Sequence, residues 1–272
     1  MLYLVGLGLG DASDITLRGL EAVRRCQRVV LEAYTSVLAA SVEELEAAYG
    51  VHIEVADREF AEQRVDEDLL ASAESEDVAF LVVGDPFCAT THSDLQLRAA
   101  QRGVEVRVVH NANILTSVGV CGLQLYRYGE CISLVFFTET WKPDSFYDKL
   151  KANRERGLHT LCLLDIRVKE LTVKALCGGK KEYEPPRYMS IQTAIQQMLE
   201  VEESRQEGAC GKDVMCVGVA RMGQRDQKIV AGTMGELLDI DMGPPLHSLI
   251  VCGEVHETEK EVLDLFKASC SQ

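Results

Sequence analysis

The sequence lacks any apolar run approaching the ~20 residues that a membrane-spanning helix needs. Its first apolar run, Leu2–Val5, has no basic segment before it and is soon followed by glycines, which argues against a signal sequence. The chain has ten cysteines, but none forms a C-x-x-C pair or a zinc-type spacing with histidine. We therefore expect a cytoplasmic protein with reduced, mostly buried cysteines, no metal site and no membrane association.

Positive charge is also scarce. Lysine and arginine number 28 against 43 acidic residues, for a net charge of −15. An acidic surface repels phosphate backbones, so we expect no nucleic-acid partner. The charge is uneven, because residues 41–77 carry 13 acidic and 2 basic residues, whereas residues 142–187 have a net charge of +4. The basic stretch, with Lys180, Lys181 and Arg187, is either a solvated face with local charge pairs or a docking surface for a protein substrate.

What the sequence does contain is a regular succession of apolar, β-branched runs with helical patterns between them. Such alternation is typical of α/β proteins with largely parallel sheets. The runs that predict strands are Leu2–Val5, Arg28–Leu31, Val78–Val83, Glu105–Val109, Ile132–Phe137, Thr160–Leu164, Met215–Val219, Lys228–Ala231 and Ser248–Cys252. For the helices, we expect Thr16, Ser93 and Ser190 as N-caps. The strand count and the small residues near 111–122 predict two domains, 1–116 and 117–272.

A glycine-rich turn, Gly6–Asp11 (GLGLGD), directly follows the first predicted strand. Glycines there let a ligand approach the backbone closely at the carboxyl end of a strand. A dinucleotide fingerprint would need a third glycine where Asp11 stands, although Glu32 lies about where a ribose-binding acid would. The turn is thus read as a site for a ligand without pyrophosphate, with a dinucleotide site or a purely structural turn as alternatives.

A second turn, Gly84–Phe87 (GDPF), ends the most apolar predicted strand. It places a carboxylate, Asp85, and free backbone groups where ligands bind in open α/β sheets. Asp85 is either a ligand contact or a turn carboxylate that accepts hydrogen bonds from nearby amides. Two such turns on one sheet edge indicate a ligand site more strongly than either turn alone.

At these motifs the chain resembles the tetrapyrrole-methylase-like S-adenosylmethionine methyltransferases, and more closely the eukaryotic diphthine methyl ester synthases. The resemblance extends over almost the whole chain. Besides the glycine turn, the segments that carry it are Leu31–Ser36 (LEAYTS), Val55–Glu59 (VADRE), Gly84–Phe87 (GDPF), Ala89–Leu95 (ATTHSDL), His159–Asp165 (HTLCLLD), Tyr183–Ser190 (YEPPRYMS) and Pro245–Ile250 (PLHSLI).

The resemblance implies two α/β domains with a cofactor cleft between them, and a homodimer. It implies methyl transfer from S-adenosyl-L-methionine to a modified histidine of translation elongation factor 2, forming diphthine methyl ester in diphthamide biosynthesis. S-adenosyl-L-homocysteine would be the product of the cofactor. By motif matching, the implied cofactor contacts are Leu9, Asp85, Cys88, Asn113, Ile114, Leu164, Met222 and His247.

Two of these positions depart from the family pattern. Cys88 stands where glycine is usual, and Asn113 stands where serine is commoner. If the backbone at 88 were left-handed, cysteine would cost ~1–2 kcal/mol and weaken the site. These departures leave open a non-catalytic binding module, alongside the alternative of a dinucleotide-dependent oxidoreductase.

Methyl transfer from a sulfonium needs no acid to expel the leaving group, so alignment and desolvation can supply most of the catalysis. We accordingly expect neither a Ser-His-Asp triad nor a metal, and we name no catalytic residue. Outside the implied cofactor set, Tyr34 and Thr35 end a predicted strand and are candidates for contact with the substrate.

Overall fold

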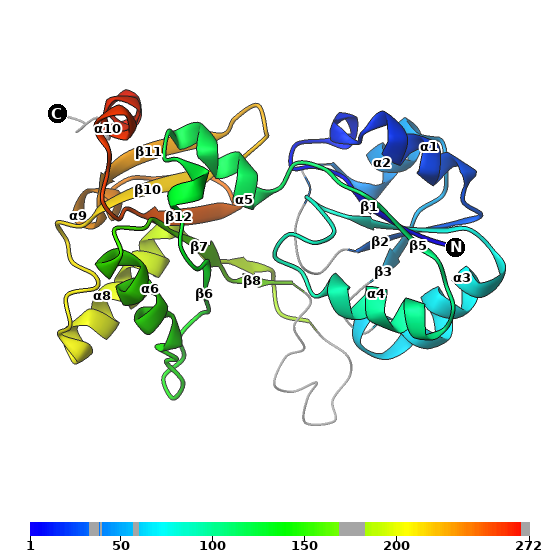
Figure 1. Ribbon diagram of the computed structural model, residues 1–272, viewed down its shortest axis with the longest axis horizontal. Helices are drawn as coiled ribbons and strands as arrows, with labels where there is room; N and C mark the ends of the chain where they lie inside the picture. The colour runs from blue at the N-terminus through cyan, green and yellow to red at the C-terminus, as the bar shows by residue number, and fades with distance from the viewer. Residues whose placement is uncertain (33–37, 39, 57–59, 169–182, 268–272) are drawn as a thin grey trace. The chain divides into compact units, whose positions relative to one another are not determined.

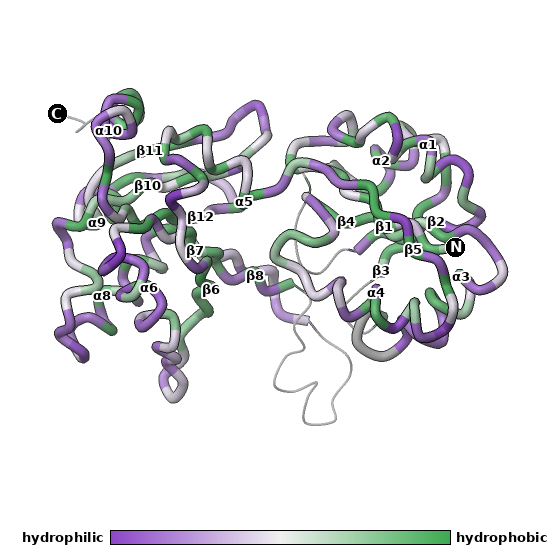
Figure 2. Tube along the Cα trace, viewed as in Figure 1, coloured by the Kyte–Doolittle hydropathy of each residue, from purple (hydrophilic) through white to green (hydrophobic). Residues whose placement is uncertain are grey.

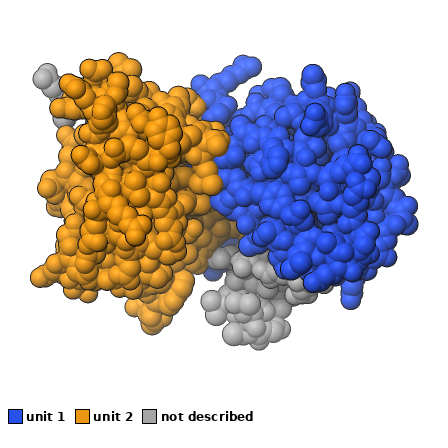
Figure 3. Space-filling view, in the orientation of Figure 1, with its two compact units in different colours: residues 1–114, 171–184, 223–225 blue, residues 115–170, 185–222, 226–272 orange. Residues whose placement is uncertain are grey.

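The computed structural model describes residues 1–32, 38, 40–56, 60–168 and 183–267. They form two compact units (Figure 3), each described here by itself. Unit 1 comprises the described residues of Met1–Ile114, Leu171–Glu184 and Gly223–Arg225, and unit 2 those of Leu115–Glu170, Pro185–Met222 and Asp226–Gln272. The boundary between 116 and 117 stays a prediction.

Unit 1 is built on a five-stranded parallel sheet in the order β3-β2-β4-β1-β5. Its strands are β1 (Leu2–Gly6), β2 (Arg28–Glu32), β3 (Glu54–Ala56), β4 (Val78–Val82) and β5 (Val106–Val109). Its helices are η1 (Ala12–Asp14), α1 (Leu17–Arg25), α2 (Val42–Tyr49), the π-helix η2 (Phe60–Leu70), α3 (Ala71–Ser75) and α4 (His92–Gln101). Ile114 opens the short α5 (Ile114–Ser117).

Both faces of this sheet are covered, which explains why β1 and β4 are apolar at nearly every position. Helices α1 and α2 pack on one face through residues such as Val23 and Leu45, while η2, α3 and α4 cover the other through residues such as Leu69 and Leu95 (Figure 1). All five residues of β4 are buried. The carboxyl ends of β1 and β4, adjacent strands, are therefore fixed side by side, and the two ligand-type turns start from them.

Unit 2 contains a five-stranded mixed sheet in the order β11-β10-β12-β7-β6 and a small antiparallel pair, β8-β9. The strands are β6 (Ile132–Leu134), β7 (Thr160–Leu164), β8 (Ile166–Arg167), β9 (Arg187–Tyr188), β10 (Met215–Ala220), β11 (Lys228–Thr233) and β12 (His247–Val251). The helices that follow α5 are η3 (Val118–Cys121), η4 (Leu125–Arg127), α6 (Ser145–Glu155), α8 (Ile191–Arg205), α9 (Met234–Leu237), α10 (Glu257–Leu263) and η5 (Asp264–Phe266).

The expectation of largely parallel sheets is wrong for unit 2. Strands β10, β11, β12 and β7 pair antiparallel, and only the β6–β7 pair is parallel among the described strands of this sheet. The physical reason is that residues 221–227 are too few for a crossover helix, so β10 turns directly back into β11. Helices α6, α8 and α9 bury one sheet face, and the strands of both units are mainly hydrophobic (Figure 2).

Two of the three expected helix caps are confirmed. Thr16 accepts a hydrogen bond from the Gly19 amide at the start of α1, and Ser190 accepts one from the Thr193 amide at the start of α8. The third is wrong, because α4 begins at His92 and its N-cap is Thr91, which makes no side-chain cap bond. His92 is therefore the first residue of the helix, and it is 4% exposed.

The described basic residues of 142–187 are largely engaged within unit 2. Lys142 pairs with Glu200 and Lys149 with Glu130, while Lys151 lies 2.8 Å from Glu207. This pattern favours a solvated face with local charge pairs over a docking surface, although Lys180 and Lys181 lie outside the described residues. No described helix combines the length and the apolar character that crossing a membrane requires.

Candidate functional site

The two ligand-type turns of unit 1 are joined to each other. The Gly8 amide donates to the Gly84 carbonyl (3.2 Å), and the Gly84 amide donates to the Gly8 carbonyl (2.8 Å). A Cβ built on Gly84 would lie within 4 Å of Leu9 Cδ2 and of Asn113 Cα. Leu9, Gly84 and Asn113 therefore form one surface at the carboxyl ends of β1, β4 and β5.

Glycine is required at this junction. A Cβ on Gly6 would approach the Gly84 carbonyl oxygen to 2.6 Å, closer than real Cβ atoms come. Gly8 has a φ of +79° and Gly84 a φ of +77°, the left-handed region that favours glycine. The Gly8–Gly84 junction thus presents bare backbone instead of side chains, as a closely bound ligand needs.

Asp85 is buried and acts within the turn. Its Oδ1 accepts from the Phe87 amide (2.9 Å), and its Oδ2 accepts from the Asn111 amide (3.1 Å) and lies 2.8 Å from His110 Nδ1. The carboxylate thereby ties the end of β4 to the residues after β5. The capping role weighed as an alternative for Asp85 is present, and each oxygen retains capacity for a further hydrogen bond.

The cysteine at 88 does not strain the turn. The left-handed residue of this loop is its neighbour Ala89, with a φ of +56°, and Cys88 is outside the set of described residues with positive φ. The conditional penalty expected for cysteine therefore does not apply. It falls instead on Ala89, where an alanine in this conformation costs ~1–2 kcal/mol.

Behind the turn lies a buried ion pair, Glu32–His92. His92 Nε2 is 3.3 Å from Glu32 Oε2, and Nδ1 is 2.8 Å from the Pro86 carbonyl. Both ring nitrogens face oxygen atoms, an arrangement that favours the doubly protonated ring. Burial lowers the pKa of His92, but the hydrogen bond and charge of Glu32, with the Pro86 carbonyl, outweigh it and raise that pKa overall.

In unit 2, the sheet brings three of the implied contacts to one edge. Leu164 ends β7, His247 opens the neighbouring β12, and Met222 lies two residues beyond Ala220, the register partner of His247 on β10. Leu164 and Met222 are buried. The sheet thus gathers Leu164, Met222 and His247 from adjacent strands that are distant in sequence.

His247 carries an unsatisfied acceptor. Its Nε2 lies 3.0 Å from the carbonyl oxygens of both Gly243 and Pro244, so this nitrogen bears the proton. Burial lowers the pKa of His247, which keeps the ring neutral. Its Nδ1 is buried and has no hydrogen-bond partner among the described residues. A neutral histidine with an unpartnered Nδ1 suits a ligand N–H donor, such as an adenine amino group.

Arg221 holds the loop that carries His247. Its guanidinium donates to the carbonyls of Met242 (2.9 Å) and Pro244 (2.5 Å) and pairs with Asp226 (2.7 Å). Arg221 itself is left-handed, with a φ of +50°, directly before Met222. The next residue, Gly223, belongs to unit 1 and lies against Leu9.

Cys210 and Cys252, two of the ten cysteines, are buried. Burial raises the pKa of Cys210 and Cys252 to about 12, so these thiols are poor nucleophiles at neutral pH. The described residues contain no group of three or more histidine, cysteine, aspartate or glutamate side chains arranged to hold a metal ion. Tyr34 and Thr35, the candidate substrate contacts, lie outside the described residues.

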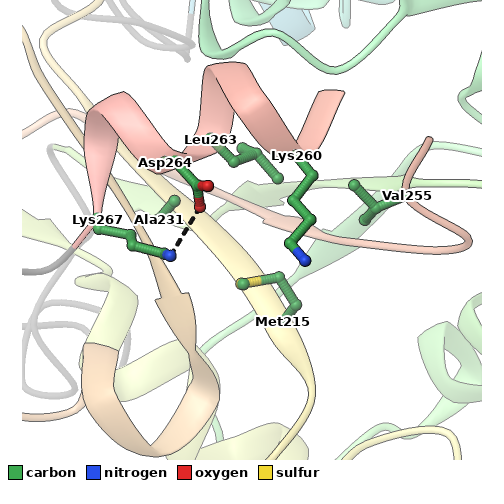
Figure 4. Close-up of a pocket in the computed structure, with 7 residues that line it drawn as sticks. All are labelled: Met215, Ala231, Val255, Lys260, Leu263, Asp264 and Lys267. Atoms are coloured by element: carbon green, nitrogen blue, oxygen red, sulfur yellow. Dashed lines mark ion pairs between the residues drawn. The ribbon is translucent and has the colours of Figure 1, made fainter. Parts of the chain in front are cut away.

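A small pocket lies elsewhere in unit 2, at α10 (Figure 4). Its volume is about 210 Å³, and Lys267 forms an ion pair with Asp264 at its border (2.7 Å). One wall is Met215, which begins β10, whereas Met222 follows the end of that strand. None of the implied cofactor contacts lines this pocket.

Sequence reasoning missed the residues that support the two turns. His110 and Asn111 hold Asp85, and Asn111 Nδ2 also donates to the Gly6 carbonyl (2.9 Å). From the sequence, Glu32 is a possible ribose-binding acid and His92 is part of the segment Ala89–Leu95, and neither position predicts their contact. A usable signal existed, because Glu32 and His110 each directly follow a predicted buried strand, where polar side chains need partners.

Comparison with known proteins gives a consistent result. The model of the tetrapyrrole (corrin/porphyrin) methylases matches residues 1–238. Diphthine methyl ester synthase of Homo sapiens is 58% identical over 98% of this chain and 95% of its own length, and that of Dictyostelium discoideum is 53% identical over 98% of both. A crystal structure of diphthine synthase superimposes with a TM-score of 0.83 at 34% identity, covering 98% of this chain and 95% of that chain.

The relatives match over nearly the full chain, and the family model's match spans the segments that form both turns. The fold of that diphthine synthase matches the one observed, in which unit 1 has a parallel sheet and unit 2 a mixed sheet. The chain belongs to the tetrapyrrole methylase family and, within it, to the diphthine methyl ester synthases.

Proposed function

We propose that this chain is the diphthine methyl ester synthase of its organism, a methyltransferase that takes methyl groups from S-adenosyl-L-methionine. The protein substrate is translation elongation factor 2 carrying the modified histidine. The observation that supports this proposal most is the junction of the two turns at Gly8 and Gly84, within a chain 58% identical to a diphthine methyl ester synthase.

The residues present suit this cofactor. The bare backbone at Gly8 and Gly84 admits a ligand close to the sheet, and the unpartnered Nδ1 of His247 offers an acceptor. We propose that the cofactor is held by the eight residues implied by the family resemblance. They are Leu9, Asp85, Cys88, Asn113 and Ile114 in unit 1, and Leu164, Met222 and His247 in unit 2. That the units enclose it in a cleft is part of the proposal.

The cofactor would supply an electrophilic methyl group on a sulfonium, with a neutral thioether as leaving group. The contribution of the chain is to bind, orient and exclude water. Apolar, buried Leu164 and Met222 suit that desolvating task, because they offer no competing nucleophile. The acceptor amine must reach the site unprotonated, while the acceptor carboxylate is already a nucleophile.

Glu32 argues against the dinucleotide alternative. A ribose-binding acid must present its carboxylate to the ligand, but Glu32 is 2% exposed and faces His92. Asp11 stands where the third glycine would be, and it accepts hydrogen bonds from the Ser13 amide and hydroxyl. Neither acid is placed for a pyrophosphate or a ribose.

We propose a homodimer in the cytoplasm, as the family resemblance implies. The charge pairs of Lys142, Lys149 and Lys151 count against this stretch as the docking surface for elongation factor 2.

Mass spectrometry of elongation factor 2 tests the function. The unmethylated precursor form is incubated with this protein and S-adenosyl-L-methionine, and the modified peptide is weighed. Addition of four methyl groups is expected, three on the amine and one on the carboxylate. Addition of three would indicate a product without the ester, and no addition would contradict the proposal.

A further inference from the structure

The Pro86 carbonyl oxygen, in the turn that carries Asp85, is contacted by two side chains. It accepts from the Thr90 hydroxyl (2.6 Å) and faces His92 Nδ1 (2.8 Å). Both donors follow Ala89, the strained left-handed residue, so they secure the loop after its sharpest bend. Within the turn, the amides of Phe87 and Cys88 also donate to Asp85.

His92 is fixed in turn from two other elements. Glu32, the last residue of β2, faces its Nε2, and the ring of Phe80 on β4 stands edge-on at 5.6 Å between centroids. His92 and Glu32 are 4% and 2% exposed. Among the described residues, Glu32 is the one charged side chain that acts on the imidazolium, because Asp85 is turned toward His110.

We propose that Glu32 and His92 are positioning residues that hold the Gly84–Phe87 turn in its cofactor-binding shape, with the imidazolium as the working state. This inference rests on the proposed cofactor site. Neither residue belongs to the implied contact set, and both act through the Pro86 carbonyl. A neutral imidazole has a single N–H and cannot donate to Pro86 and Glu32 together.

The consequence is a pH dependence of cofactor binding with a known sign. The imidazolium is complete at low pH and is lost as pH rises through the pKa of His92, which the pair with Glu32 raises. Affinity for the cofactor should then weaken on the alkaline side. Loss of a partner that orients a metal ligand weakens metal binding roughly ten- to a hundredfold, and we expect the lower end of that range for this turn.

Calorimetric titration with S-adenosyl-L-homocysteine, from about pH 6 to about pH 8.5, tests this in four proteins. They are the wild type, His92→Gln, Glu32→Gln and the matched control His159→Gln. His159 is a second buried histidine beside a glutamate, Glu259, in unit 2, so its loss probes general destabilisation. Changes in the protonation of S-adenosyl-L-homocysteine itself affect all four proteins equally, so they cancel in the comparison.

We expect the wild type and His159→Gln to bind alike and to weaken together as pH rises. His92→Gln and Glu32→Gln should bind about tenfold more weakly at the low end, with a flatter pH profile. If one variant fails to fold, two other measurements decide. The first is the difference between the wild type and the remaining variant in how steeply affinity changes with pH. The second is the set of nitrogen chemical shifts of the His92 ring in the wild type. Wild-type binding matched by both variants at every pH would overturn the positioning role alone. A wild type that binds no S-adenosyl-L-homocysteine would overturn the cofactor site as well.

Discussion

Each unit of this protein buries one histidine beside one glutamate, but the two histidine rings differ in the protonation state that their surroundings favour. Glu32–His92 in unit 1 and Glu259–His159 in unit 2 have the same oxygen–nitrogen distance, 3.3 Å. All four residues are less than 5% exposed. Distance and burial therefore do not decide the charge state.

The second ring nitrogen decides it. His92 Nδ1 faces the Pro86 carbonyl while its Nε2 faces Glu32, so both nitrogens favour carrying a proton. His159 Nδ1 instead accepts from the Gly253 amide (3.1 Å), so only its Nε2 can carry a proton toward Glu259. Burial lowers the pKa of His159 and the ring stays neutral. A histidine–glutamate contact is thus an ion pair in one unit and a neutral-donor hydrogen bond in the other.

The same substitution in both pairs should expose this difference most strongly. His92→Phe removes the cation that faces buried Glu32, and we expect a loss of about 3–5 kcal/mol in the free energy of unfolding. His159→Phe removes a neutral donor from Glu259, which keeps the amides of Gln124 and His256, and about 1–3 kcal/mol should be lost. Urea unfolding of both variants gives the two values. Equal losses would contradict the assigned charge states.

Removing the carboxylate of the neutral pair tests its structural role. Glu259 accepts from the Gln124 amide (2.9 Å), the His256 amide (2.8 Å) and His159. Glu259→Ala leaves three buried donors without their acceptor, so we expect a loss of about 3 kcal/mol. The control is Glu257→Ala in the first turn of the same helix, where an exposed side chain should change stability by less than about 0.5 kcal/mol. Similar melting temperatures for the two variants would refute the role.

The two pairs should also respond to pH in opposite directions. The pKa of His159 is lowered from 6.5 and that of Glu259 from 4.5, so their stabilisation is complete above those values and declines as pH falls below them. The pKa of His92 is raised from 6.5, so its stabilisation is complete below that value and is lost as pH rises. Relative to the other buried amides, the Gly253 amide should exchange its hydrogen faster in acid, and the Phe87 amide should do so in alkali. Parallel profiles would count against both assignments.

The smallest expected effect concerns the turn that His92 supports. Ala89→Gly relieves the left-handed alanine and should stabilise the chain by up to about 1 kcal/mol. Cys88→Gly restores the residue usual in the family but relieves nothing, and should be neutral or slightly destabilising. Thermal unfolding distinguishes them. A gain from Cys88→Gly and none from Ala89→Gly would place the strain at the wrong residue.

The strands show how much of the fold can be predicted from the sequence. All nine predicted strands are present, because long buried runs such as Val78–Val82 leave little alternative. The strand Glu54–Ala56 was missed, since three residues with two exposed carry no readable pattern. The antiparallel return from β10 to β11 could have been predicted from the short, glycine-containing link between them.

The site was partly predictable for a related reason. Turns that follow strands stay attached to their strand ends, so Leu9 and Asp85 could be placed at one edge of unit 1. The supporting pairs could not, because Glu32 meets His92 only through the adjacency of β2 and β4, and His159 lies 100 residues from Glu259. Protonation then depends on a third partner, which no spacing rule specifies.

Calorimetric titration of the wild-type protein with S-adenosyl-L-homocysteine and, separately, with NAD tests the cofactor assignment most directly. The turn at Gly8 and Gly84, the unpartnered His247 Nδ1 and the engagement of Glu32 by His92 predict saturable binding of S-adenosyl-L-homocysteine and none of NAD. Binding of NAD without binding of S-adenosyl-L-homocysteine would contradict it.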